Sequence, residues 1–331
     1  MCGISSFHAT GDNCHIAAQQ RGYDGSMRHQ HFYALGSSGF HRIAYTDWGQ
    51  PADPHVVLCV HGLARNSRDF DFLAAALESD CRVLCMDVAG RGDSEWLENR
   101  SEYTFSTYQS DAAAMLARAG GSGQASWLDK LRGNGETRLD WVGTSMGGLI
   151  GMFLAARRNS PIRRLVLNDV GAFIPWSALF RMKGYITRGR SFASLDEVEA
   201  YLREVCATFG PLTDAQWRHL ASHGVRRNAE NLLELKYDPK IAEGLHGHFD
   251  PEFPLGPDLL RGIDLWNVWG KIECPVLVLR GAESEVLLKK TLSEMQERKP
   301  GIEVAEFAGV GHAPGLMSED QIQVVKRFLL K

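Results

Sequence analysis

A serine stands between two glycines in Gly143-Thr144-Ser145-Met146-Gly147, where a predicted strand turns directly into a predicted helix. A turn this sharp holds the serine in a strained backbone conformation, and the flanking glycines remove Cβ atoms that would clash. The Ser145 hydroxyl would then stand above the sheet, at the positive N-terminus of the helix. These residue types in this order predict that Ser145 is a nucleophile for acyl transfer.

Acyl transfer also needs two backbone N–H groups directed at the oxygen that becomes negatively charged. Met146, the residue after the nucleophile, would supply one of them. The other is expected from Leu63 in His61-Gly62-Leu63, which follows the apolar run at 56–60. Gly62 lets the backbone approach closely, and His61 is interpreted as a residue that orders this loop through hydrogen bonds.

The general base is predicted to be His312. It lies in Gly311-His312-Ala313-Pro314, directly after the last predicted strand, and it is the only one of the twelve histidines in such a position. From a short loop there, the imidazole can reach over the strand ends to Ser145 Oγ and take its proton.

The elements that must position these residues alternate between strand and helix. Fully apolar runs such as VVLCV at 56–60 are typical of buried parallel strands, and apolar residues at helical spacing mark the segments between them. The predicted strands are 31–35, 40–49, 56–60, 82–88, 138–143, 163–170, 275–281 and 301–309, and the predicted helices include 68–79, 104–120, 145–158 and 320–330. This alternation predicts an α/β fold with a mostly parallel eight-stranded sheet and helices on both faces.

Two segments interrupt this alternation. Residues 120–138 form a glycine-rich run that is long for such a connection, which we interpret as a surface insertion. Residues 172–270 contain several short helical patterns and no buried-strand run. They are predicted to form a helical cap inserted into a core made of 31–171 and 271–331. Residues 1–30 are polar and are expected to be a poorly ordered N-terminal extension.

Four motifs resemble those of the α/β-hydrolase family in order and spacing. They are HGLARNSRDF, DVAGRGDS at 87–94, GTSMGG and GVGHAP at 309–314. The resemblance covers residues 31–331 apart from the insertion at 120–138, and it implies a capped serine hydrolase. It also implies that the 87–94 turn, which is similar to the family's D-x-x-G-x-G-x-S turn, shapes the core and is not catalytic.

A third side chain must orient the imidazole and stabilise its charged form. In most of this family the acid lies three residues beyond the glycine that ends the 275–281 strand, where this chain has Ser284. A subset of the family carries the acid after the strand that follows the nucleophile helix, and this chain resembles that subset in having Asp169 there. Those relatives often show G-x-x-S at the usual acid position, as in Gly281-Ala282-Glu283-Ser284. We therefore predict Asp169 as the acid, with Glu285 as the alternative.

The implied reaction is two-step acyl transfer through an acyl-enzyme, which requires no metal and no organic cofactor. Substrate recognition is expected in the cap. There Phe173, Trp176 and Trp266 would either line an apolar pocket or form the cap's own core. Arg65 lies two residues after Leu63, on the loop expected to supply an oxyanion donor. It would hold a substrate carboxylate if it faces inward, and would otherwise be a solvated side chain.

These residues favour a carboxylic-ester hydrolase that acts on a small or medium substrate. An alternative within the same fold is hydrolysis of a C–C or C–N bond, or of a lactone, in a carboxylate-bearing catabolic intermediate. A hypothesis of another class is a receptor that keeps the hydrolase pocket for binding without turnover. Fold analogy alone does not choose among the three, because function resides in the site.

Composition indicates which classes of binding partner and which compartment to expect. The chain has 331 residues, with 36 basic against 40 acidic side chains and a net charge of −4, which gives no electrostatic argument for binding nucleic acid or an anionic membrane. Its seven cysteines are irregularly spaced, which favours a reducing compartment over a disulfide framework. The first thirty residues contain no continuous apolar stretch of the kind found in a secretory signal, and no apolar run reaches the length of a membrane span. We therefore expect a cytoplasmic protein with a small-molecule substrate.

Overall fold

The computed structural model describes residues 27–121, 137–178, 190–241 and 262–331. The predictions for the N-terminal extension and for the 120–138 insertion fall almost entirely outside these residues.

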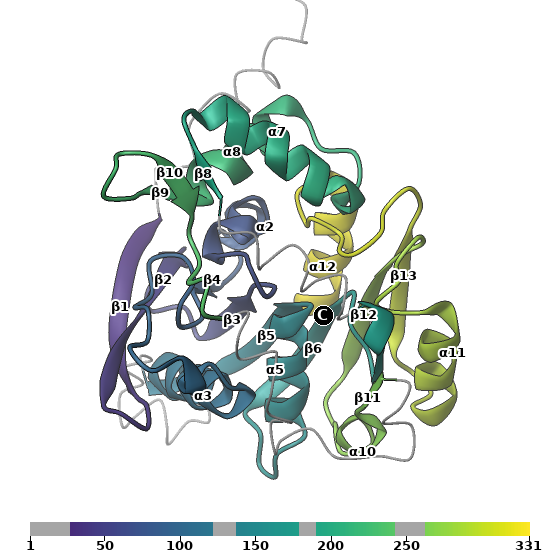
Figure 1. Ribbon diagram of the computed structural model, residues 1–331. Coiled ribbons are helices and arrows are strands. Elements are labelled where there is room, and N and C mark those ends of the chain that lie inside the picture. Colours follow the sequence, from purple (N-terminus) through teal and green to yellow (C-terminus); the bar gives the residue numbers. More distant parts are fainter. Residues whose placement is uncertain (1–26, 122–136, 179–189, 242–261) are drawn as a thin grey trace, which may run out of the picture.

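An eight-stranded sheet forms the centre of the molecule (Figure 1). Its strands are β1 (Arg28–Leu35), β2 (Phe40–Trp48), β3 (His55–Val60), β4 (Arg82–Met86), β5 (Arg138–Thr144), β6 (Ile162–Asn168), β12 (Val276–Gly281) and β13 (Glu303–Phe307). They lie in the order β1-β2-β4-β3-β5-β6-β12-β13. β2 pairs antiparallel with β1 and β4, and the other neighbours are parallel. The predicted α/β fold with a mostly parallel eight-stranded sheet is confirmed.

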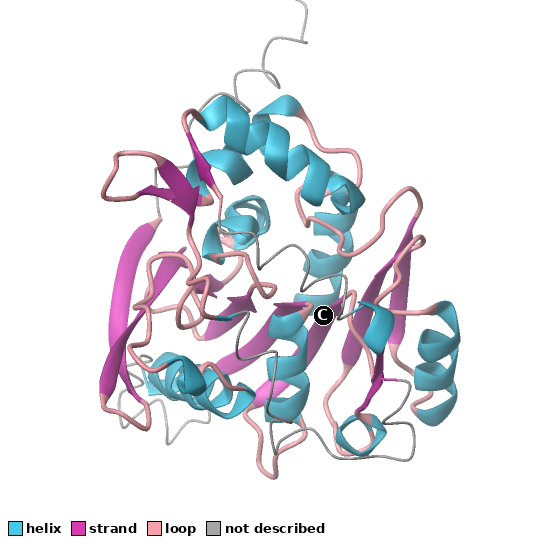
Figure 2. Ribbon diagram, in the orientation of Figure 1, coloured by secondary structure: helices cyan, strands magenta, loops and turns pink. Residues whose placement is uncertain are grey.

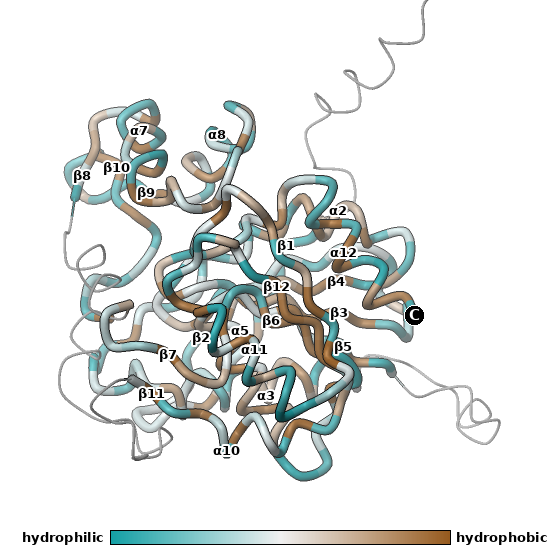
Figure 3. The backbone as a smooth tube through the Cα atoms, turned by 90° about the vertical axis from the view of Figure 1, so that its right-hand side faces the viewer, coloured by the Kyte–Doolittle hydropathy of each residue, from teal (hydrophilic) through white to brown (hydrophobic). Residues whose placement is uncertain are grey.

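The apolar sequence of β3 explains why this strand is covered on both faces. Successive side chains of a strand point to opposite faces of the sheet. Val56, Leu58 and Val60 belong to one hydrophobic cluster, and Val57 and Cys59 belong to another. All five are buried, so β3 has no solvent face. Figure 3 shows the same concentration of hydrophobic residues along the central strands.

Helices supply the two covering layers. They are α2 (Asp71–Leu77), α3 (Phe105–Gly121), α5 (Met146–Ala155), α11 (Lys289–Arg298) and α12 (Glu319–Leu329), with the short 3-10 helices η1 (Ser67–Phe70) and η2 (Arg100–Glu102). Met115 of α3 and Ile150 of α5 join the cluster of Leu58, whereas Leu73 of α2 and Phe328 of α12 join the other cluster. Among the described residues, no helix is both long enough and apolar enough to cross a lipid bilayer.

The described parts of the segment 172–270 contain more strand than the sequence predicts. The helices are α7 (Leu195–Val205), η3 (Ala207–Phe209), α8 (Asp214–His223) and α10 (Trp266–Trp269). The strands are β7 (Phe173–Pro175), β8 (Ser191–Phe192), β9 (Val225–Arg227), β10 (Leu233–Leu235) and β11 (Gly262–Asp264), which form a three-stranded sheet β8-β10-β9 and the pair β11-β7. Strands of two or three residues are too short to show the alternation by which strands are recognised.

α7 and α8 lie together at one end of the molecule, beyond the edge of the central sheet (Figure 2). Val198 and Leu202 of α7 pack with Trp217 and Leu220 of α8 in a hydrophobic cluster of their own. This arrangement supports the interpretation of the segment as a cap, which remains a prediction.

Candidate active site

The predicted catalytic side chains follow three different strands of the sheet. Ser145 follows β5, Asp169 follows β6, and His312 follows β13. Because these strands run parallel, their carboxyl ends lie along one edge, which is where open α/β sheets bind ligands. Residues far apart in the sequence are thereby brought to one place.

The turn at Ser145 has the strained geometry that its sequence predicts. Ser145 has φ 52° and ψ −113°, a conformation that residues other than glycine seldom adopt. A Cβ on Gly143 would lie 2.3 Å from the Gly147 carbonyl oxygen, and a Cβ on Gly147 would lie 2.0 Å from the Val60 carbonyl oxygen. Both glycines are therefore required by contacts with backbone atoms that cannot move aside.

Replacing Gly147 with alanine should lower the free energy of unfolding by about 3 kcal/mol, because the new methyl group overlaps the β3 backbone. Gly120→Ala is the matched control. Its Cβ would meet only Leu139 Cδ1 at 3.7 Å, within α3, where alanine is favoured over glycine by up to about 1 kcal/mol. Urea denaturation of both variants checks the contrast, and equal stability of the two would contradict it.

A continuous chain of hydrogen bonds joins the three side chains. Ser145 Oγ lies 2.9 Å from His312 Nε2, and His312 Nδ1 lies 2.7 Å from Asp169 Oδ2. With the proton of the neutral imidazole on Nδ1, that nitrogen donates to Asp169 and Nε2 accepts from Ser145. Asp169 is fully buried, whereas the His312 side chain is 20% exposed. This arrangement leaves Nε2 free to receive the Ser145 proton.

Asp169 receives two further hydrogen bonds, and both come from the end of β12. Gly281 N donates to Oδ1 at 2.9 Å, and Ser284 Oγ donates to Oδ2 at 2.6 Å. Ser284, at the position where most of the family has its acid, thus holds the carboxylate that the neighbouring strand supplies. Glu285, the alternative acid, is exposed, and the carboxylate on His312 Nδ1 is that of Asp169.

The two predicted oxyanion donors flank Ser145. Met146 is the first residue of α5, so its backbone N–H has no acceptor within the helix. Leu63 follows Gly62, which lies close to Ser145: a Cβ on Gly62 would be 3.7 Å from Ser145 Cβ. The role of Leu63 and Met146 as oxyanion donors remains a prediction.

His61 orders the loop that carries Leu63. Burial above all, and also the positive charges of Arg91 and Arg65, lower the pKa of His61 to about 3, so the ring is neutral at neutral pH. Its Nδ1 donates to the Gly62 carbonyl oxygen at 2.7 Å, and its Nε2 accepts from Val88 N at 3.0 Å. Both ring nitrogens are engaged, which fits a loop-ordering residue better than a base.

Of the four residues considered for substrate binding, Arg65 and Trp266 are in contact with other charged side chains of the protein. Arg65 donates to both oxygens of Asp69, at 2.9 and 2.6 Å, so a carboxylate of the protein already occupies its guanidinium. Phe173 and Trp176 are half-buried at β7, and the half-buried Trp266 stacks under the Arg298 guanidinium at 4.2 Å. Their role in substrate binding remains a prediction.

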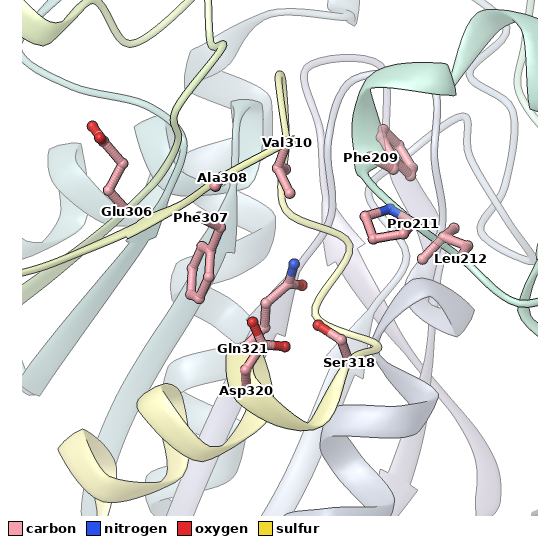
Figure 4. A pocket seen from close by; sticks show the side chains of 10 residues that line it. All are labelled: Phe209, Pro211, Leu212, Glu306, Phe307, Ala308, Val310, Ser318, Asp320 and Gln321. Atoms are coloured by element: carbon pink, nitrogen blue, oxygen red, sulfur yellow. The ribbon is translucent and has the colours of Figure 1, made fainter.

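A cavity of about 210 Å³ lies beside the loop that carries His312 (Figure 4). Phe209, Pro211 and Leu212 of the 172–270 segment line one side, while Phe307 and Val310 of the core line another. The cavity lies between the core and the 172–270 segment, next to the candidate site, and Ser145, Asp169 and His312 do not line it.

Within the described residues, one cluster has the side chains of a metal site. His219 Nε2 of α8 lies 3.2 Å from Asp71 Oδ2 of α2, and the His219 and His223 rings are 4.5 Å apart. Arg68 lies 2.7 Å from the same Asp71 oxygen and already neutralises its charge. We interpret the cluster as a contact between α2 of the core and α8 of the 172–270 segment. The sequence did not predict it, because α2 and α8 are far apart along the chain.

The class of protein follows from this topology together with the comparison of sequences. A model of the alpha/beta hydrolase family matches residues 57–326, and the chain belongs to that family.

Two relatives and a solved structure illustrate the similarity. The chain is 40% identical over 301 residues to the 3-hydroxybutyrate-oligomer hydrolase of Cupriavidus necator, covering 89% of this chain and 94% of that protein. It is 23% identical to a pimeloyl-[acyl-carrier protein] methyl ester esterase of Neisseria meningitidis, covering 82% and 75% of the two chains. An alpha/beta hydrolase from Novosphingobium aromaticivorans superposes with a TM-score of 0.76 at 32% identity, covering 92% of this chain and 99% of that one. With such relatives, the chain is a hydrolase.

Proposed function

We propose that this protein is a serine ester hydrolase that works through Ser145, His312 and Asp169. The observation that carries the proposal is the pair of hydrogen bonds, 2.9 Å from Ser145 to His312 and 2.7 Å from His312 to Asp169. A nucleophile, a base and an orienting carboxylate in this order are the arrangement that activates a serine for attack on a carbonyl carbon.

The reaction proceeds in two halves. His312 Nε2 takes the Ser145 proton while Oγ attacks the ester carbonyl carbon, and the Leu63 and Met146 N–H groups stabilise the oxyanion. The imidazolium then protonates the departing alkoxide, leaving an acyl group on Ser145. In the second half the same nitrogen takes a proton from water, which attacks the acyl carbon. Collapse of that intermediate releases the acid and restores the Ser145 hydroxyl.

We further propose that the substrates are short oligoesters of 3-hydroxy acids. The Cupriavidus necator relative is a 3-hydroxybutyrate-oligomer hydrolase, and its 40% identity extends over nearly the full length of both chains. Such an oligomer is a medium-sized carboxylic ester with one free carboxylate, and its hydrolysis needs only the acyl-transfer chemistry described above.

The test is hydrolysis of the 3-hydroxybutyrate dimer and trimer by the purified protein, followed by the release of monomer, beside a series of p-nitrophenyl esters of increasing acyl length. Saturable release of monomer that disappears in Ser145→Ala supports the whole proposal. Turnover of p-nitrophenyl esters alone keeps the serine esterase and overturns the substrate class. Tight binding of the oligomer without turnover of any ester would instead identify a receptor.

Thr208→Val should lower kcat roughly fivefold, the effect of about 1 kcal/mol from one hydrogen bond. Thr208 of η3 donates through Oγ1 to the His312 carbonyl oxygen at 2.6 Å, and its own carbonyl oxygen accepts from Gly311 N at 2.7 Å. Valine keeps the shape and the second bond, while Thr208→Ser keeps both. Steady-state kinetics should show full activity in the serine variant, and a valine variant with lower Tm but unchanged kcat would limit Thr208 to a structural role.

A further inference from the structure

Arg91 lies in the turn 87–94 that follows β4, and its side chain contacts both residues of the candidate oxyanion hole. Its Nε donates to the Leu63 carbonyl oxygen at 2.9 Å, and its Nη2 lies 3.9 Å from Met146 Sδ. Its Nη1 donates to the Ala89 carbonyl oxygen at 2.7 Å and to Tyr108 Oη at 2.8 Å. The turn therefore does more than shape the core, because one of its side chains joins the loops on either side of Ser145.

The guanidinium of Arg91 is buried among neutral partners. Arg91 is 0% exposed, and its hydrogen-bond partners among the described residues are two carbonyl oxygens, a phenol and a thioether. The Tyr108 and Tyr103 rings face its Cζ with centroids at 4.8 and 5.8 Å. The buried Asp238 carboxylate accepts from Tyr103 Oη at 2.7 Å instead of pairing with Arg91 directly.

A buried guanidinium that lacks a directly bonded carboxylate is unfavourable, because its lost hydration is not offset by a counter-charge at contact distance. An apolar side chain of similar volume, such as methionine, would fill the same space in the core without that cost. Sequences depart from such packing rules mainly at functional sites. The position of the charge, next to Leu63 and Met146, indicates which function it serves.

We propose that Arg91 is a positioning residue of the oxyanion hole, which restrains the Leu63 backbone and the Met146 side chain and adds a fixed positive charge to the field at the developing oxyanion. The inference rests on the proposed function. The bond to the Leu63 carbonyl oxygen restrains the peptide that follows Leu63, and the contact with Met146 restrains the first residue of α5. The charge acts over more than contact distance because the buried site screens it weakly.

Two variants separate these contributions. Arg91→Met keeps much of the volume and removes both the charge and the hydrogen bonds, whereas Arg91→Lys keeps the charge on a single nitrogen. We expect kcat to fall by about 10- to 100-fold in the methionine variant and by a smaller factor in the lysine variant, with KM within about threefold of the parent. Arg327→Met, at an exposed position of α12, is the control and should leave kcat unchanged.

A pair of matched inhibitors tests whether the loss falls on the oxyanion. A trifluoromethyl ketone forms a tetrahedral adduct with a nucleophilic serine and carries the oxyanion, while the corresponding methyl ketone binds largely without forming the adduct. In Arg91→Met, the Ki of the trifluoromethyl ketone should rise by the factor by which kcat/KM falls, and the Ki of the methyl ketone should stay within about threefold. Equal loss of both affinities would reduce Arg91 to a structural residue and overturn the inference.

The same inhibitors separate this inference from the proposed function. In Ser145→Ala the trifluoromethyl ketone should bind no more tightly than the methyl ketone, and undiminished binding there would overturn the nucleophile itself. Loss in Ser145→Ala together with an unchanged Ki in Arg91→Met would overturn only the role of Arg91. If Arg91→Met does not fold, by circular dichroism and thermal melting, Arg91→Lys carries the test. A Ki of the trifluoromethyl ketone unchanged in the lysine variant, with kcat also unchanged, then rejects the proposal.

Discussion

Ser145→Ala should lower kcat by about 10⁴- to 10⁶-fold, because alanine has no group that can form the acyl-enzyme. The stability of the protein should change little, since the only hydrogen bond recorded for Ser145 Oγ, within the described residues, is the one to His312. The measurement is steady-state turnover of the best p-nitrophenyl ester, with thermal melting of both proteins alongside.

A control variant and a labelling experiment test which serine reacts. Ser293→Ala, on the exposed face of α11, removes a hydroxyl of the same kind and should leave turnover unchanged. A fluorophosphonate should add one phosphonyl group to the parent protein, and peptide mass spectrometry should locate it on Ser145. A Ser145→Ala protein that still turns over ester, and loses this activity when it is phosphonylated, would show that another residue is the nucleophile.

Much of the core could be predicted because buried parallel strands have a distinct composition. A run such as Val56–Val60 is apolar at every position, and β3 occupies that place in the sheet with both faces covered. The same logic located the strand ends and hence the loops of Ser145 and His312. The helices α2, α3, α5 and α12 followed from their apolar spacing, whereas α11, between β12 and β13, was not predicted.

The contacts that hold the site were not predictable, because they join residues that are distant in sequence and carry no local pattern. The sequence gives no sign that Thr208 of η3 bonds the His312 carbonyl, or that Arg91 reaches both Leu63 and Met146. Arg65 and Asp69 are only four residues apart, yet the sequence did not show whether the Arg65 side chain faces the active site or a protein carboxylate. Such contacts depend on how loops cross one another at the sheet edge.

The choice of the candidate acid shows how sequence and structure complement each other. Sequence patterns reduced the choice to Asp169 and Glu285, and resemblance favoured the first. The structure adds the physical reason for a serine at the usual acid position: Ser284 Oγ donates to Asp169 Oδ2 at 2.6 Å and so helps to hold the carboxylate toward His312. A hydroxyl there complements an acid that comes from β6.

Asp169→Asn should lower kcat by about 10³- to 10⁴-fold, although it replaces only one carboxylate oxygen with an NH₂ group. Gly281 N donates to Oδ1, so the amide oxygen of asparagine takes that position and the NH₂ group takes the position of Oδ2. The NH₂ group then faces His312 Nδ1 and can only donate to it. The imidazole proton must move to Nε2, where it blocks acceptance of the Ser145 proton.

Glu285→Gln is the matched control, a change from carboxylate to amide at an exposed side chain, and it should leave kcat within about twofold of the parent. Comparison of kcat for the two amide variants against the same ester decides the acid. A large loss in Glu285→Gln with little loss in Asp169→Asn would transfer the role to Glu285. Because the asparagine variant retains the size and burial of Asp169, a similar Tm with a large loss of kcat assigns the effect to the imidazole tautomer and not to misfolding.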